Sequence, residues 1–557
     1  MASASASSRG SGGYRPRSFR RLRPILLGTV VLATCFEGFA VSSSRLWVAP
    51  DSSEHITLAA EILEHGNISH ELSQRRPPGY PLFLAAMFAV FKTNSAAAIH
   101  VVQHGMVVGC AVLSVLMAWT LWPHRGFAAM VGLVSGASLH LSGYANAVLT
   151  EVPYALLLTL SMLLVLRHWT THGLGSLAAG SLAIGLAILM KPTGQAIPGL
   201  VLMVSLAGWW KTRRLVDDAS GGSSRETEAP RRGHPGVVAR VVCSLGPAAA
   251  VLVPVALHQY DTFGYFQVTA MGHVAPFYRA VHVEHLGVAD SEALTRVEQW
   301  VTDARRAGAI PWEAGDQSVH TVLKACTATR GFTVSECYRI MGRAGWDILR
   351  GHPGRILRGS AVTAYRMFVM PDRAYRIVPG GAPGEAGRFA RQAVMLSPDT
   401  YTPHVVDRVG SARMNRYMRV SGRAGGASDL WTGFARWYHA TMERGRPMLG
   451  VADSPYEAFA LMSVLGFGAG MVFGRHRAGW MILAAVVAYH VGVSSLIGSL
   501  EPRFVIPLHP VLHVAQGFFL VGVARWARRV VGMIGVRWPG KAGAGVGAGR
   551  ESWVVSC

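Results

Sequence analysis

Two acidic and two basic residues lie close together just after the first apolar segment of the chain. Asp51 and Glu54 are three positions apart, so on a helix they would share one face. Arg75 and Arg76 precede a turn rich in proline and glycine that contains Tyr80 and leads into a new apolar run. A carboxylate can take a proton from a hydroxyl group, and arginine forks match the geometry of phosphate. These residue types suit chemistry on a phosphate-linked substrate at a membrane surface.

A purely structural interpretation is open for the same residues. Asp51 and Glu54 have the spacing of a capping box at a helix N-terminus. Arg75 and Arg76 have the character of a basic anchor at the bilayer surface that binds no substrate. The structural and the chemical interpretation can hold together for the acidic pair.

Three further charged residues stand where an apolar segment begins or ends. Glu151 begins one segment, Lys191 closes another and Arg503 opens the last one. An ionisable residue at membrane depth is costly and marks a functional site by default. A helix-start acid explains Glu151 equally well, and snorkelling to the interface explains the two cations. The recurrence of charge at one predicted membrane boundary favours a shared site.

Glu37 differs from these residues because it lies inside the first apolar segment. It needs a partner within the helix bundle or a water-filled cavity, and the sequence does not name one. His140 is interpreted as a core histidine in preference to a metal ligand, and no metal-type cysteine spacing occurs. Cys326 and Cys337 lie near each other in a hydrophilic segment and are candidates for a disulfide.

The composition indicates a membrane protein. Of the 557 residues 50% are hydrophobic and only 15% are charged, whereas soluble domains carry about 25% charged residues. Apolar windows of the length needed to cross a bilayer occur at 24–43, 98–121, 127–143, 152–167, 176–190, 195–210, 237–257, 455–473, 479–497 and 504–524. The sequence therefore predicts an all-α polytopic membrane protein with about ten transmembrane helices.

The distribution of basic residues predicts how the chain is oriented. The arginine-rich start stays in the cytoplasm by the positive-inside rule, and ten spans place every short basic loop on that same side. We expect an integral plasma (inner) membrane protein, multi-pass, with both termini cytoplasmic. The net charge of +22 lies in loops that flank the membrane and in the long outer segment. It therefore favours anionic membrane lipids as partners, and not nucleic acid.

Five parts of the chain follow from this pattern. They are a disordered basic N-terminus (1–23), an N-terminal transmembrane block (24–257) with a first external loop at 44–97, a mostly helical external segment (258–454), a C-terminal transmembrane block (455–524) and a basic flexible tail (525–557). Residues 290–307 and 319–350 show helical spacing of apolar residues. The large external segment is thus expected to be built mainly of helices.

Four motifs occur in an order that resembles one superfamily. They are R-R-P-P-G-Y-P-L-F-L-A at 75–85, L-T-E-V-P-Y at 149–154, L-M-K-P-T-G at 189–194 and E-P-R-F-V-I-P-L-H-P at 501–510. Their order and spacing resemble the C-type integral-membrane glycosyltransferases (GT-C), in particular the protein O-mannosyltransferases and the lipid A aminoarabinose transferases. The resemblance covers mainly the two membrane blocks, and it implies a GT-C-like bundle of about ten helices.

The resemblance also implies a reaction. A sugar would move from a polyprenyl- or dolichyl-phosphate donor to a protein, lipid or glycan acceptor on the extracytoplasmic side. The catalytic aspartate of the first loop maps onto Asp51, with Glu151 as a second catalytic candidate. Phosphate-binding cations map onto Lys191 and Arg503, and less directly onto Arg76. The remaining candidates for substrate binding are Glu54, Arg75 and Tyr80. No cofactor is expected with certainty, no metal site is expected, and a divalent-metal requirement stays open.

Three departures from the family pattern bear on the substrate class more than on the fold. Ser52 follows Asp51 where relatives often have a second acid, His55 stands where tyrosine is common, and Lys191 replaces arginine. Two other classes stay open: a transporter or flippase of a lipid-linked glycan, and a non-catalytic membrane scaffold. Transporters often contain paired inverted halves, and the sequence shows no such symmetry.

Overall fold

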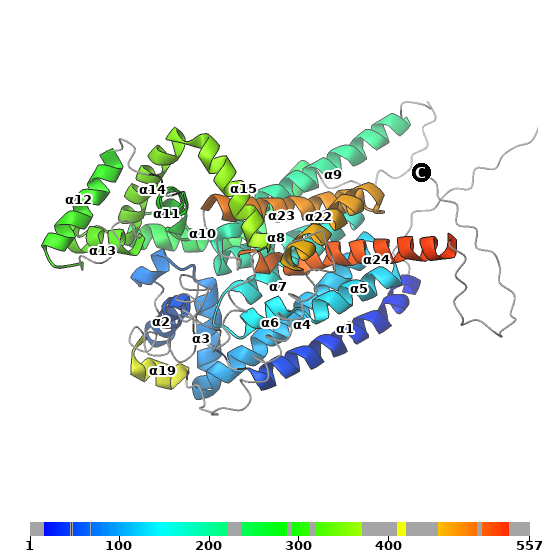
Figure 1. Ribbon diagram of the computed structural model, residues 1–557, viewed down its shortest axis with the longest axis horizontal. Helices are drawn as coiled ribbons and strands as arrows, with labels where there is room; N and C mark the ends of the chain where they lie inside the picture. The colour runs from blue at the N-terminus through cyan, green and yellow to red at the C-terminus, as the bar shows by residue number, and fades with distance from the viewer. Residues whose placement is uncertain are drawn as a thin grey trace, which may run out of the picture.

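The computed structural model describes residues 16–44, 46, 48, 50–66, 68, 70–220, 236–284, 286, 292–310, 319–369, 409–418, 455–497 and 504–533. Within these ranges all regular structure is helical, and no strand is formed. Figure 1 shows a long bundle of helices with a second group of shorter helices at one of its ends. The predicted all-α class is confirmed for this part of the chain.

The helices fall into a bundle and an end group. The bundle consists of α1 (Pro16–Ser43), α3 (Gly79–Phe91), α4 (Ser95–Leu121), α5 (Arg125–Gly136), α6 (Leu139–Ala145), α7 (Glu151–Thr171), α8 (Leu174–Met190), α9 (Ile197–Ser220), α10 (Val237–Phe263), α22 (Pro455–Phe473), α23 (Arg477–Ile497) and α24 (His509–Met533). The end group consists of α2 (Pro50–His65), α11 (Met271–Tyr278), α12 (Glu292–Arg306), α13 (Val319–Arg330), α14 (Val334–Gly351), α15 (Pro353–Val369) and α19 (Ser411–Tyr417). Short helical turns η1 (Glu71–Gln74), η2 (Lys92–Asn94), η3 (Pro192–Gly194), η4 (Arg279–Val283) and η6 (Ile506–Leu508) connect them.

In the part of the chain that the structure describes, seven helical stretches are long and apolar enough to cross a membrane. They are Arg20–Ser43, Gly79–Leu121, Arg125–Ala145, Glu151–Thr171, Val237–Phe263, Arg477–Leu496 and Ile506–Val531. Two shorter apolar helices, Leu174–Met190 and Ala458–Phe473, match further predicted windows. The window predicted at 195–210 lies in α9, which is not one of the seven stretches. The molecule is of the multi-span helical type, while the total of about ten spans stays a prediction.

Both ends of the bundle can be recognised in Figure 1. The start of α1 and the end of α24 lie at one end, which we call the terminal end. The opposite end, where α2 and α12–α14 lie, is called the site end. At the terminal end the Arg525 guanidinium lies 4.5 Å from the centre of the Trp122 ring and 2.7 Å from His124. This contact joins the last helix to the connection between α4 and α5.

Many basic residues next to short connections lie at the terminal end, because the long stretches of the bundle alternate in direction, whereas Lys92 of η2 and the loop with Arg75 and Arg76 lie at the site end. The basic residues at the terminal end are Arg125, Arg167, Lys211, Arg213, Arg214, Arg475, Arg477, Arg525, Arg528 and Arg529. The site end instead carries charged residues that are paired with one another, as described below. The two ends of the bundle therefore differ in chemical character.

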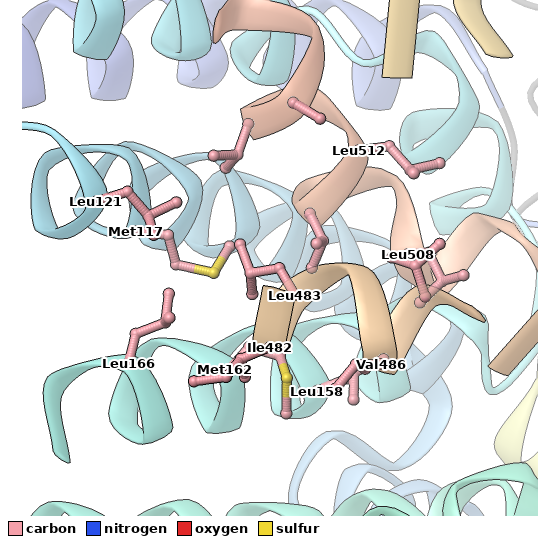
Figure 2. Packing of buried hydrophobic residues seen from close by; sticks show 14 of the residues in the cluster. Met117, Leu121, Leu158, Met162, Leu166, Ile482, Leu483, Val486, Leu508 and Leu512 are labelled. Carbon is pink, nitrogen blue, oxygen red and sulfur yellow. The ribbon is translucent and has the colours of Figure 1, made fainter. Parts of the chain in front are cut away.

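The bundle core is built from large apolar side chains of α4, α7, α23 and α24. Figure 2 shows part of it, where Met117, Leu158 and Leu483 from three of these helices pack with Leu512 of α24. Burial of each side chain of this size stabilises the protein by about 1.5–3 kcal/mol in aqueous reference systems. The same core contains Trp480, which is fully buried. This packing fixes the helices whose ends reach the site.

A second apolar core holds α11–α14 together, and we call these four helices the head. Cys326 of α13 and Cys337 of α14 form a disulfide, which confirms the predicted pairing. Helices α11 and α14 approach each other closely at two glycines. A Cβ atom on Gly342 would lie 2.1 Å from the His273 carbonyl oxygen, and one on Gly345 would lie 2.1 Å from the Phe277 nitrogen. Only glycine fits at these two crossings.

The head is fastened to the bundle through a buried arginine. Arg279 of η4 is fully buried and pairs with Glu284. Its Nη1 donates to Thr363 Oγ1 on α15 at 3.1 Å and to the carbonyl oxygen of Ser495 on α23 at 2.5 Å. A buried charge with these partners is costly to disturb. The head is thus held in a defined place relative to the site end.

Candidate functional site

The first charged group of the site lies between α2 and the loop that follows η1. Arg76 contacts two carboxylates of α2, through Nη2 with Asp51 Oδ1 at 2.7 Å and through Nε with Glu54 Oε2 at 2.5 Å. Arg75 Nη1 lies 2.8 Å from the second oxygen of Glu54. These four residues form what we call the acid–arginine cluster. Their side chains are 14–28% exposed, so solvent reaches the cluster while much of each charge is covered.

The position at which α2 begins shows whether Asp51 and Glu54 cap the helix. The helix begins at Pro50, so Asp51 lies within the first turn, not at the capping position before it. Glu54 gives both of its carboxylate oxygens to the arginines. The capping-box interpretation is therefore wrong for Glu54. The expectation that the two acids share a helix face is confirmed, because both face Arg76.

The arginine-bearing loop is held in place by the head. Gln74 Oε1 accepts hydrogen bonds from the backbone nitrogen of Ser335 at 3.0 Å and from its hydroxyl at 2.6 Å. The Gln74 carbonyl oxygen accepts from Ala270 N at 2.7 Å. Thr269 Oγ1 donates to the carbonyl oxygens of Gln74 and Arg75, each at 3.1 Å. The position of the two arginines thus depends on helices far away in the sequence.

Tyr338 of α14 adds a neutral hydroxyl next to Arg75. Burial raises the pKa of Tyr338, while the neighbouring Arg75 guanidinium acts in the opposite direction. The phenol therefore stays protonated at physiological pH and can donate a hydrogen bond. Sequence reasoning missed Tyr338 and Ser335, since 261 positions separate Ser335 from Gln74. Helical spacing predicted this helix but gave no signal of where it docks.

The second charged group is the pair of Glu151 and Lys191. Lys191 Nζ lies 3.1 Å from Glu151 Oε1, and both side chains are at most 10% exposed. The ammonium group also lies 4.2 Å from the centre of the Phe504 ring. The carbonyl oxygen of Phe504 is in turn 2.9 Å from His490 Nε2. The pair joins the start of α7 to the end of α8 beside the chain that enters α24.

Side chains of α2 link the two charged groups. Ser52, the neighbour of Asp51, donates to the carbonyl oxygen of Val148 at 2.7 Å, three residues before Glu151. The His55 ring packs edge-on against Tyr80 with centroids 5.2 Å apart. The acid–arginine cluster is therefore attached directly to the segment that carries the second pair.

Tyr80 lies beside His55 in the interior of the site end. Its hydroxyl donates to Gln103 Oε1 at 2.9 Å, and the Gln103 amide donates to the carbonyl oxygens of Ala145 and Ala147. Tyr80 is fully buried. It therefore positions the surrounding backbone in this state and is not open to solvent. Its predicted role in substrate binding stays a prediction.

Most of the predicted site residues are thus brought to one end of the bundle. Asp51, Glu54, Arg75 and Arg76 meet directly, and Glu151 and Lys191 meet each other. Arg503 lies outside the described residues. Among the residues that are described, no group of three or more His, Cys, Asp or Glu side chains could hold a metal ion. The His140 ring packs against His509, with centroids 4.6 Å apart.

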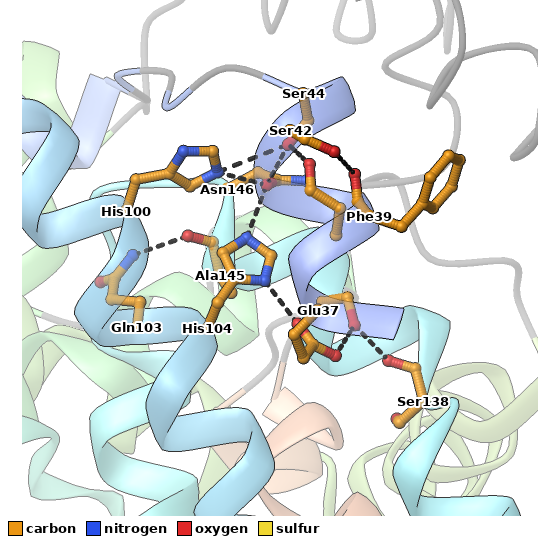
Figure 3. Close-up of polar contacts among 12 residues, drawn as sticks. Glu37, Phe39, Ser42, Ser44, His100, Gln103, His104, Ser138, Ala145 and Asn146 are labelled. Atoms are coloured by element: carbon orange, nitrogen blue, oxygen red, sulfur yellow. Dashed lines mark hydrogen bonds and ion pairs between the residues drawn. The ribbon is translucent and has the colours of Figure 1, made fainter. Parts of the chain in front are cut away.

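Glu37 has the partners that the sequence did not reveal. In the interior of the bundle it contacts His104 Nδ1 (Figure 3). It also contacts the Ser142 hydroxyl. These contacts lie in a polar network separate from the two charged groups of the site. Only the depth of Glu37 in an apolar segment signalled this network from the sequence.

No model of a known protein family matches this chain, and no curated protein matches it. The resemblance to the GT-C superfamily therefore rests on the sequence motifs alone. Chemically, the site combines partly exposed carboxylates, which can accept a proton, with three cations that can bind an anion.

Proposed function

We propose that this protein is a glycosyltransferase. It moves a sugar from a polyprenyl-phosphate-linked donor to an acceptor on the extracytoplasmic side of the membrane. The observation that carries the proposal is the acid–arginine cluster at one end of a membrane-type bundle. Asp51 is partly exposed there and is held beside Arg76. A base for the acceptor and cations for the phosphate are thus close together.

Each residue has a defined part in this reaction. Asp51 takes the proton of the acceptor hydroxyl as the oxygen attacks the anomeric carbon of the donor. The bond from that carbon to the phosphate oxygen breaks, and the phosphate leaves with its negative charge. Arg75, Arg76 and Lys191 stabilise this charge, which is the role of positioned cations in group transfer. Glu151 keeps Lys191 in place through their buried ion pair.

The distribution of charge supports the proposed orientation. Many basic residues of the short loops lie at the terminal end, which is therefore the proposed cytoplasmic end by the positive-inside rule. The site end and the head then face the extracytoplasmic side of a plasma membrane. The head contains a disulfide, and disulfides persist in such oxidising compartments. Anionic lipids are the expected partners of the basic terminal end.

The test uses purified protein in lipid with a panel of radiolabelled polyprenyl-phosphate sugars and a mixture of acceptors. Release of lipid phosphate is followed for the wild type and for Asp51→Asn. We expect the variant to bind the donor but to lose about 10²–10⁴-fold in rate, the usual contribution of a positioned base. The matched control is Asp303→Asn. Asp303 also pairs with an arginine, but on the head, at 2.9 Å from Arg330.

Equal rates for Asp51→Asn and wild type would contradict the proposed role of Asp51. Donor binding without release in either protein, together with transport of the donor across vesicles, would favour a flippase. A protein that binds no donor at all would favour a membrane scaffold. Loss of release in the Asp303→Asn control would mean that the assay reports folding and not catalysis.

A further inference from the structure

A network of hydrogen-bonded polar side chains lies inside the bundle, apart from the charged side chains of the site. Glu37 lies on α1 about two helical turns before its end and is 3% exposed. His100 and His104 lie on one face of α4, one turn apart. Asn146 follows α6, and Ser44 follows α1 (Figure 3). Three separate parts of the chain therefore contribute to this network.

Every polar atom of Glu37 has a partner. Its Oε2 contacts His104 Nδ1, and its Oε1 accepts from the Ser142 hydroxyl at 2.5 Å. The other nitrogen of His104, Nε2, lies 2.9 Å from the amide oxygen of Asn146. A carboxylate buried without a counter-charge at this depth is very costly. The protonation of this pair is therefore constrained by the atoms on both sides of His104.

The amide oxygen of Asn146 can only accept, so His104 Nε2 must carry a proton. With a single proton on the ring, Nδ1 would then point a lone pair at Glu37. The contact between Nδ1 and Oε2 is attractive only if one more proton lies between them. That proton is either on the carboxyl group or on the imidazole ring. In both cases the pair as a whole is uncharged.

We propose that Glu37 and His104 form a binding site for one proton inside the bundle. Release of the proton leaves Glu37 as a carboxylate. His104 must then donate to it from Nδ1, which leaves a lone pair at Nε2. The Asn146 amide then has to reverse and present its NH₂ group. Occupancy of the site is thus coupled to the orientation of Asn146.

Asn146 connects this equilibrium to the charged site. It lies between Ala145 and Ala147, whose carbonyl oxygens accept from Gln103. The next residue, Val148, accepts from Ser52 of α2. On the other side, the Asn146 oxygen accepts from Ser44 at 2.6 Å and lies 2.8 Å from His100 Nε2. A reversal of the amide changes all of these neighbours together.

Two further titratable residues of α4 lie near the pair. The His100 ring lies edge-on to His104 with centroids 4.8 Å apart, and Cys110 is buried about two turns further along the same helix. Asn146 and Ser142 are neutral partners. The inference does not rest on sugar transfer, because it follows from the hydrogen-bond geometry alone.

The test is spectroscopic and uses the full chain in lipid. Infrared difference spectra report the carbonyl stretch of a protonated carboxyl group, and ¹⁵N-histidine NMR reports which ring nitrogens carry protons. At neutral pH we expect one of two results in the wild type. Either a carboxyl band is present that disappears in Glu37→Gln, or His104, assigned with His104→Gln, is protonated on both nitrogens.

An ionised Glu37 beside a singly protonated His104 would overturn the proposal. This measurement needs only the wild type to fold, since the variants serve for assignment. In Glu37→Gln the side-chain amide can donate to His104 Nδ1 and so imitates the proton-bound state. Thr159→Val is the matched control, because Thr159 is also buried in the bundle but donates within its own helix to Ala155. Its spectra should equal those of the wild type.

Discussion

Arg76 contacts both Asp51 and Glu54 of α2, and this sharing determines the balance of charge in the acid–arginine cluster. The two carboxylates and two guanidinium groups of the acid–arginine cluster balance each other. Glu151 and Lys191 do the same in the second group. In the proposed reaction a phosphate group would meet cations that are already paired with carboxylates and would have to compete for them. Its binding would then be governed by local geometry more than by long-range attraction.

The buried pair of Glu151 and Lys191 should be sensitive to the loss of one partner. We expect Lys191→Met to lower the free energy of unfolding by about 3–5 kcal/mol, because it leaves an uncompensated buried carboxylate. The double variant with Glu151→Gln should recover a large part of this loss. The measurement is denaturant unfolding in detergent micelles.

An exposed ion pair supplies the control for that experiment. Arg296 and Glu292 pair on α12 with side chains that are 60% and 81% exposed. Arg296→Met should change the stability by less than about 1 kcal/mol. If the single and double variants at positions 191 and 151 lost equal stability, their coupling would be refuted.

At the scale of elements, α14 holds the arginine-bearing loop in its position. One of its ends binds Gln74 through Ser335, and its next turn places Tyr338 against Arg75. The same helix packs on α11 at glycines and is tied to α13 by the disulfide. Displacement of α14 should therefore reach the charged site, although α14 contributes none of its ionised groups.

Gly345→Ala tests this dependence. The added Cβ atom would lie 2.1 Å from the Phe277 nitrogen, so α14 has to move away from α11. We expect a loss of about 1–3 kcal/mol in stability, typical of overpacking, together with weaker donor binding. Gly351→Ala in the last turn of the same helix meets nothing within 4 Å and should be neutral. The free energy of unfolding and the donor affinity are measured for both variants. Equal values for Gly345→Ala and Gly351→Ala would show that α11 and α14 are not tightly packed at Gly345.

The sequence predicted much of the helical fold but not how its parts meet. Apolar windows located most bundle helices, because periodicity is a local property. Helical spacing located α12 and the segment 319–350, which the structure divides into α13 and α14. The Cys326–Cys337 disulfide was also predictable from the sequence, since both residues lie in one short hydrophilic segment. The contact of Ser335 with Gln74 was not predictable, because it depends on how two distant segments of the chain pack together. For the same reason Glu37 could be recognised as needing a partner, while His104 could not be named.

The candidate site was predictable to a similar extent. The order of the motifs identified Asp51, Arg76, Glu151 and Lys191 as candidates. In the structure they form two ion pairs, Asp51 with Arg76 and Glu151 with Lys191. The sequence did not reveal that these charges pair with each other. Hydrophobic patterns place residues at a membrane boundary, but they carry no information about side-chain pairing there.

At the scale of the whole molecule, the bundle has chemically different ends, and this predicts its topology. Lys211 on α9 belongs to the terminal end, whereas Lys324 is exposed on α13 of the head. We expect a membrane-impermeant thiol reagent to modify Lys324→Cys in intact cells. Lys211→Cys should react only after the membrane is permeabilised.

The labelling background replaces Cys35, Cys110, Cys243 and Cys557 with serine and keeps the head disulfide. The unmodified background is the control and should not be labelled. Modification of both introduced cysteines from the same side would contradict the proposed orientation, even if each variant folds normally.

The double pairing of Arg76 has a consequence for turnover. During the proposed transfer Asp51 becomes protonated, and a neutral acid no longer competes for Arg76. Nη2 of Arg76 would then be available to the departing phosphate when the phosphate charge is greatest, while Nε stays paired with Glu54. When Asp51 returned its proton to water, the carboxylate would recapture Arg76 and displace the spent lipid carrier. One side chain shared between two acids would thus couple the loss of a proton to product release and reset the protein for the next donor.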